Sequence, residues 1–343
     1  MSMRFVVKVS FVAATLLTGA VVVHYIFCSA ANRCQTTDLG PQLPTHRSSP
    51  QAPAPSAGTG QPPLSEADTE ALIALFALPG NLAAARLADK FTGASESARR
   101  VILQRLSEHL SKDANPAVRV QCATCLAWCG PKAVEALLSA LNADPDVGVR
   151  SRAAASLGQA GGRPELPHLY RAIQAEIGAA GRPGDVSFAA IGSIGDIGGP
   201  EASILLMALW QDPRLIGGAR ERTIMSMGTA GSKVSLGVVM HALHGSDRDP
   251  GMRSAATFAL AAIARCNQED GAVVSSVRTV MRKGLLDKDR AVRVHAADGL
   301  SSVGDRGDVH VLRGLEQSDP DLYVQRAAGV AANSIEARLE RRE

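Results

Sequence analysis

The stretch AVRVQCATCLAWCG, residues 117–130, contains the pattern that decides the fold of this chain. It reads Val-Arg, then small residues, then Leu, then Gly four residues after the Leu. The pattern returns as GVRSRAAASLGQAG at residues 148–161 and as AVRVHAADGLSSVG at residues 291–304. Looser copies begin at Gly218 and Gly251, so the same unit is repeated along much of the chain.

The arginine of this pattern gives the period of the repeat. This position recurs every 31 to 40 residues. It is held by Arg119, Arg150, Arg220, Arg253 and Arg293, and by Ser187 and Gln325 in the two copies that lack the arginine. A period in the thirties with helical patterning inside it is typical of an α-solenoid. No convincing stretch alternates with a period of two, which argues against strands. We therefore expect an all-α fold, an α-solenoid of about six helix pairs.

The composition favours helices that pack closely and gives little sign of chemistry. The chain has 343 residues, of which 46% are apolar and only 3% aromatic, and its net charge of +3 is too weak to indicate a nucleic-acid or membrane-surface role by itself. No kinase, zinc-protease or nucleophile-elbow motif is present. We expect no enzymatic activity, no cofactor or metal, no nucleic-acid partner and no small-molecule substrate.

The N-terminal residues 1–31 form a separate segment. Arg4 and Lys8 precede an apolar stretch, residues 9–27, that has no charged side chain. Its length is close to that of a membrane-spanning helix, which favours a signal anchor, and a signal peptide cleaved after Ala30 or Ala31 is the alternative. The basic residues predict that the N-terminus stays inside and the rest of the chain lies outside the cytoplasm.

Residues 32–65 are rich in Pro, Ser and Ala and predict a disordered linker. Residues 66–112 contain helical patterns that do not fit the repeat, over 67–76, 81–91 and 95–110. Because a solenoid has to close its exposed end, we interpret these as N-terminal capping helices.

Each repeat is expected to hold two helices. The first carries the Val-Arg and Leu positions, and the second carries two apolar residues four apart, which share one helix face and point into the stack. These pairs are Leu137/Leu141, Leu169/Ile173, Leu205/Leu209, Val239/Leu243, Met281/Leu285 and Val311/Leu315. A final helix is expected from Asp321 to about Arg341.

Four segments show an Asp six residues before the Arg. They are Asp113 with Arg119, Asp144 with Arg150, Asp247 with Arg253, and Asp287 with Arg293. This spacing resembles the HEAT repeat signature, and its short form is similar to the HEAT-like repeats named after bilin lyases. We place the solenoid at residues 113–343. The resemblance extends from Asp113 to about Asn333. It implies a right-handed solenoid in which these Asp and Arg side chains form a structural ladder between neighbouring repeats.

Cys122, Cys125 and Cys129 share one helix face, at spacings that suit a metal or a redox pair. They align with Ala153, Ser156 and Ala160 of the next repeat, which favours buried small residues, with a local disulfide and a metal site as the alternatives. His241 and His244 lie three residues apart, and we interpret them as surface histidines.

Function is predicted mainly from the fold. We expect a protein-interaction scaffold, membrane-tethered or exported, with an unknown protein or peptide as partner. A bilin-lyase-like protein or another enzyme-associated HEAT protein is the alternative. HEAT proteins generally use the second helices to line their concave side, so the resemblance implies a binding surface there. The candidates on those helices are Glu135, Ser139, Arg171, Met207, Trp210, His241, Arg278 and Arg282. For Trp210, packing between repeats is the alternative to binding.

Overall fold

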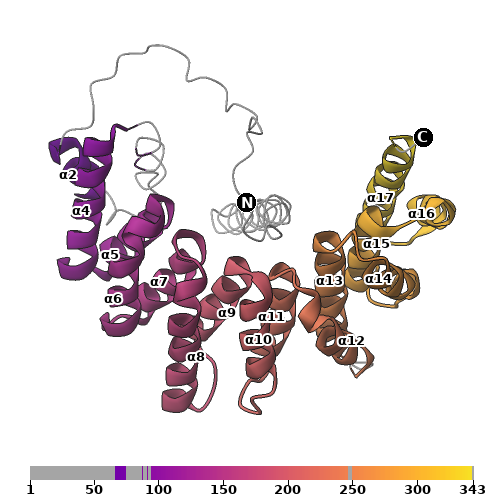
Figure 1. The fold of residues 1–343 in the computed structure, drawn as a ribbon, viewed down its shortest axis with the longest axis horizontal. Helices are drawn as coiled ribbons and strands as arrows, with labels where there is room; N and C mark the ends of the chain where they lie inside the picture. The colour runs from indigo at the N-terminus through magenta and orange to yellow at the C-terminus, as the bar shows by residue number, and fades with distance from the viewer. Residues whose placement is uncertain (1–65, 75–86, 88–90, 92–93, 246–248, 342–343) are drawn as a thin grey trace, which may run out of the picture. The chain divides into compact units, whose positions relative to one another are not determined.

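The computed structural model describes residues 66–74, 87, 91, 94–245 and 249–341 (Figure 1). These residues form helices and no strand, which confirms an all-helical chain of repeated helices consistent with an α-solenoid. The expected anchor at 1–31, the linker at 32–65, Asp247 and most of the capping helix expected at 81–91 lie outside this part of the chain. Within it, no helix is both long and apolar enough to cross a bilayer.

First and second helices alternate along the repeats. The first helices are α5 (Pro116–Leu126), α7 (Val147–Ala160), α9 (Asp185–Ile197), α11 (Gly218–Thr229), α13 (Pro250–Cys266), α15 (Arg290–Val303) and α17 (Leu322–Glu340). The second helices are α6 (Val134–Ala143), α8 (Leu166–Ala180), α10 (Gly199–Trp210), α12 (Leu236–His244), α14 (Gly271–Gly284) and α16 (Arg306–Ser318). Before them come α2 (Glu66–Ala74) and α4 (Glu96–Lys112), and α4 packs on α5 in the way that α6 packs on α7.

Five of the seven first helices begin at short polar residues that cap them. Asn115, Asp146, Asp249, Asp289 and Asp321 each lie four residues before the arginine position and accept hydrogen bonds from backbone N–H groups of the first turn. These bonds satisfy donors that have no partner inside the helix. The acid-rich turns of the repeat thus fix where each of these helices starts.

Neighbouring first helices pack closely because small residues meet where they cross. A Cβ atom added to Gly158 would lie 2.9 Å from the Cα atom of Ser193, and one added to Gly228 would lie 2.5 Å from the Cα atom of Ala259. Side chains larger than hydrogen would therefore push these backbones apart. Neighbouring second helices, in contrast, contact one another little, so grooves can open between them.

The inward face of α16 differs from the prediction. Val311 was expected to point into the stack, but it is 49% exposed, and Leu312 is fully buried instead. A capping box formed by Asp305 and Asp308 starts this helix, and Asp308, four residues before Leu312, is itself buried. The helix is thus turned so that a paired carboxylate, rather than Val311, faces inward.

Candidate functional site

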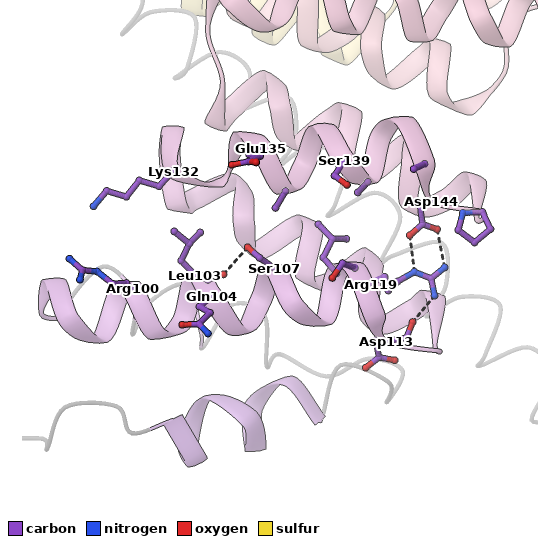
Figure 2. A pocket seen from close by; sticks show the side chains of 16 residues that line it. Arg100, Leu103, Gln104, Ser107, Asp113, Arg119, Lys132, Glu135, Ser139 and Asp144 are labelled. Carbon is purple, nitrogen blue, oxygen red and sulfur yellow. Dashed lines mark hydrogen bonds and ion pairs between the residues drawn. The ribbon is translucent and has the colours of Figure 1, made fainter.

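A groove of about 660 Å³ lies between α4 and α6, two helices of the second layer (Figure 2). Leu103, Leu110, Ala136 and Ala140 supply apolar surface to it. Polar side chains from both helices and from the turn before α6 line the rest: Arg100, Gln104, Ser107, Ser111, Lys132, Glu135 and Ser139. A groove with apolar surface and a few hydrogen-bonding groups is the common form of a ligand site.

Small side chains line the groove along much of one face of α6. Ala136, Ser139, Ala140 and Ala143 follow one another at spacings that place them on a single face. Along α4 the lining runs from Arg100 to Ser111, a rise of about 16 Å, which would span an extended peptide of about five residues.

One end of the groove is closed by the ion pair of Arg119 and Asp144 (Figure 2). Arg119 Nε and Nη2 donate to Oδ2 and Oδ1 of Asp144 at 2.8 and 2.9 Å, and Nη1 donates to the backbone oxygen of Asp113 at 2.8 Å. Burial raises the pKa of Asp144, but the hydrogen bonds from Arg119 and from the backbone N–H of Asp146 outweigh it and lower that pKa. This end is therefore a fixed, charge-paired wall.

The other end carries Arg100 and Lys132, which lie near each other in Figure 2. Lys132 Nζ donates to Glu96 Oε1 at 2.6 Å, and both side chains are largely exposed. Between the ends, Ser107 and Ser111 donate to backbone oxygens of their own helix. Their oxygens can still accept hydrogen bonds from a bound chain, as can Ser139 and Glu135 on the facing helix. This arrangement suits a peptide backbone.

Six of the eight residues predicted to bind a partner lie on four second helices from α8 to α14, and none of these six lines the groove. Arg171 on α8 and His241 on α12 are exposed. Met207 and Trp210 on α10 are half-buried against the core, and the Arg220 guanidinium carbon lies 4.0 Å from the centre of the Trp210 ring. The other two candidates, Glu135 and Ser139, do line the groove.

Arg278 and Arg282 on α14 are engaged within the chain. Both pair with Asp305 at 3.0 Å, and Arg282 Nε donates to Asp308 Oδ1 at 2.6 Å. Arg278 Nε also donates to the backbone oxygen of Val303 at 2.6 Å. These contacts hold the turn between α15 and α16, so the two guanidinium groups have a role in the fold, and their role in binding a partner stays a prediction.

The ladder residues pair between repeats at three places. Arg119 pairs with Asp144, Arg253 with Asp287, and Arg293 with Asp319, each through two hydrogen bonds. Arg150 instead donates to the backbone oxygens of Asp144 and Pro145. Gln325 keeps one contact of this kind, donating to the backbone oxygen of Asp319 at 2.7 Å.

The three cysteines of α5 and the turn after it carry free thiols. Cys122 and Cys125 are buried and Cys129 is partly so, and burial raises the pKa of Cys125 and Cys129 to about 12 and that of Cys122 further. Thiols of this kind stay protonated at neutral pH and are poor nucleophiles and metal ligands. Within the described ranges, no group of three or more His, Cys, Asp or Glu side chains could hold a metal ion.

The sequence analysis missed the wall that α4 contributes, because these residues lie outside the clear repeats. A usable signal was present in the run of small residues on one face of α6, since small side chains on an exposed helix face leave room beside a neighbouring helix.

Comparison with known proteins supports the repeat assignment over part of the chain. Residues 103–180, which include most of the groove, match a family model described as HEAT repeats. No curated protein matches the chain. Among solved structures, human deoxyhypusine hydroxylase in complex with glycerol is 18% identical, with a TM-score of 0.34, over 68% of this chain and 96% of that one. Kap121p is 16% identical, with a TM-score of 0.42, over 79% of this chain and 34% of that one.

Proposed function

We propose that this protein is a non-enzymatic interaction scaffold that holds a peptide segment of a partner protein in the groove between α4 and α6. The observation that carries the proposal is the groove itself, with apolar surface at its base and side-chain oxygens on both walls. The HEAT match covers most of it, and arrays of this kind commonly serve protein interactions. The bilin-lyase alternative has no support of its own.

We propose further that residues 1–31 anchor the chain in a membrane as a single-pass segment and that the helices lie outside the cytoplasm. Secretion after cleavage is the alternative. The support is the charge and length pattern of that segment, with Arg4 and Lys8 before an apolar stretch.

A substitution that fills the groove tests the binding proposal. Ser139 is exposed and points into the groove, so Ser139→Trp blocks it without a change in the core. Ser276→Trp, at an exposed position of α14, is the matched control. The three proteins are used for affinity purification from membranes, and the bound proteins are quantified.

We expect one partner to be retained by the parent and by Ser276→Trp and reduced at least about tenfold with Ser139→Trp, a change of about 1.4 kcal/mol or more in binding. Its affinity is then measured with purified proteins. If every retained protein binds Ser139→Trp as well as it binds the parent, the groove is not the binding site.

A further inference from the structure

One histidine connects the N-terminal helix α2 to the rest of the array. His109, on α4, has its Nε2 atom 2.9 Å from Oε2 of Glu70 on α2. Its Nδ1 atom is 3.1 Å from Oδ2 of Asp113, which follows α4 and lines the groove. Each ring nitrogen thus faces a carboxylate from a different segment.

Only the protonated ring can satisfy both contacts. A neutral imidazole has one N–H group and one lone pair, so one of its nitrogens would face a carboxylate oxygen with no hydrogen between them. The imidazolium ion donates from both nitrogens, and hydrogen bonds between charged groups are the stronger kind. The strength of the contact between His109 and α2 therefore depends on one proton.

The helix held in this way covers part of the core. Thr69 is fully buried and Ile73 is 1% exposed, and α2 contacts both α4 and α5. Release of α2 would expose the apolar surface against which Ile73 packs. The contact of His109 with Glu70 therefore links the protonation state of one histidine to whether α2 stays packed over this hydrophobic surface.

The surroundings of His109 favour the charged ring. Burial lowers its pKa, but the hydrogen bonds to Glu70 and Asp113 outweigh that effect and raise the pKa above its ordinary value. The other described groups near this contact are three charged side chains of α4 and one buried thiol. They are Arg105, 3.5 Å from Glu70, with Glu108 and Lys112 on α4, and on α5 the neutral thiol of Cys122.

We propose that His109 is a proton-operated latch for α2: the protonated ring ties α2 to α4 through Glu70, and loss of the proton weakens the tie. This proposal does not rest on what the groove binds. A raised pKa means that its contribution is complete below the ordinary histidine pKa of about 6.5 and is lost as pH rises through the pKa of the folded protein. Arg105 also contacts Glu70, at 3.5 Å, and this contact does not involve the histidine ring, so loss of the proton loosens the helix rather than releasing it.

Two measurements on the full chain test this proposal, and their results are compared with each other. NMR of the labelled histidine rings gives the pKa of His109, and hydrogen exchange gives the protection factor of the amides of residues 70–74, corrected for the intrinsic effect of pH. We expect a pKa above about 6.5 and a loss of protection as pH rises from about 6.5 through that pKa, tenfold for each unit by which the contact with Glu70 raises the pKa. The amides of α8 serve as the internal reference.

Glu70→Gln removes the carboxylate that α2 contributes. It should bring the pKa of His109 down and make the protection of α2 independent of pH, whereas His244→Gln on α12 should change neither. A pKa of His109 at or below about 6.5 would overturn the proposal. So would a loss of α2 protection that follows pH equally in Glu70→Gln and in the parent.

Discussion

Cys122 is the clearest case in which a reactive residue type has a packing role. It has no exposed surface, it lies in the core formed by α5 and its neighbours, and burial raises its pKa. Ala153 takes the same place in the next repeat and is also fully buried. At this position the structure needs a small side chain, and a thiol meets that need as well as a methyl group does.

Substitution at Cys122 separates packing from chemistry. Cys122→Ala should leave folding nearly intact, whereas Cys122→Leu should cost about 1–3 kcal/mol through overpacking. Urea denaturation of the two variants and the parent measures the difference, and elemental analysis of the purified parent is the control. Stoichiometric zinc or iron that is lost in Cys122→Ala would contradict the packing role.

Single side chains on the second helices were the hardest to assign from sequence. The helical period identified Leu137, Leu169 and Met281 as inward-facing, and all three are buried. It could not show that Arg278 and Arg282 have carboxylate partners, because Asp305 and Asp308 lie on the next second helix or just before it. A contact between helices depends on how they pack, and the spacing within one helix does not report it.

At the scale of the helix, α9 shows how the array tolerates a departure from its repeat. Ser187 takes the place of the arginine, and Glu176 of α8 compensates by reaching the start of α9. Its carboxylate accepts hydrogen bonds from the N–H groups of Gly184, Val186 and Ser187 and from the Ser187 hydroxyl, at 2.5 to 3.3 Å. Burial raises the pKa of Glu176, but these hydrogen bonds outweigh it and lower the pKa.

Glu176→Gln should destabilise the protein by about 1–3 kcal/mol, because a neutral amide cannot accept all four hydrogen bonds and leaves backbone donors unsatisfied. Urea denaturation at neutral pH measures the loss. In the parent, this contribution is complete above the ordinary glutamate pKa and is lost as pH falls through the lowered one, so the two proteins should converge in stability in acid.

Glu201→Gln is the matched control. Glu201 lies at the exposed start of α10 and contacts Arg163 at 3.5 Å, so its loss should change stability by less than about 0.5 kcal/mol. Equal effects of the two substitutions would mean that Glu176 acts only as a surface charge. The sequence shows that Ser187 takes the place of the arginine, but the compensating group lies eleven residues earlier on another helix, and only the structure identifies it.

At the scale of the whole molecule, the period of the arginine positions was sufficient to predict repeated helices, because each repeat contains the same cap and the same small residues. The groove was less predictable, since it depends on the distance between α4 and α6 and on what fills the space between them. Localisation depends on residues 1–31 and stays a prediction from their charge pattern.

A reporter fused after Glu343 tests that prediction. With Arg4 and Lys8 before the apolar stretch, a reporter that is active only after export should be active at this position. A reporter that functions only in the cytoplasm should be silent in the matched fusion. Exchange of Arg4 and Lys8 for Glu should weaken this orientation. Activity of the cytoplasmic reporter in the unaltered chain would refute the proposed topology.

The contrast between the two helix layers has a mechanical consequence. Where Gly158 meets Ser193 and Gly228 meets Ala259, there is no free space, so the first helices resist both compression and sliding. The second helices have few contacts with one another, so little close packing opposes a change in their separation. The stiffness of the array should therefore depend on direction: the softest deformation is a splaying of the second helices about the layer of first helices. The width of the groove between α4 and α6 then becomes an elastic quantity, which thermal energy alone can vary.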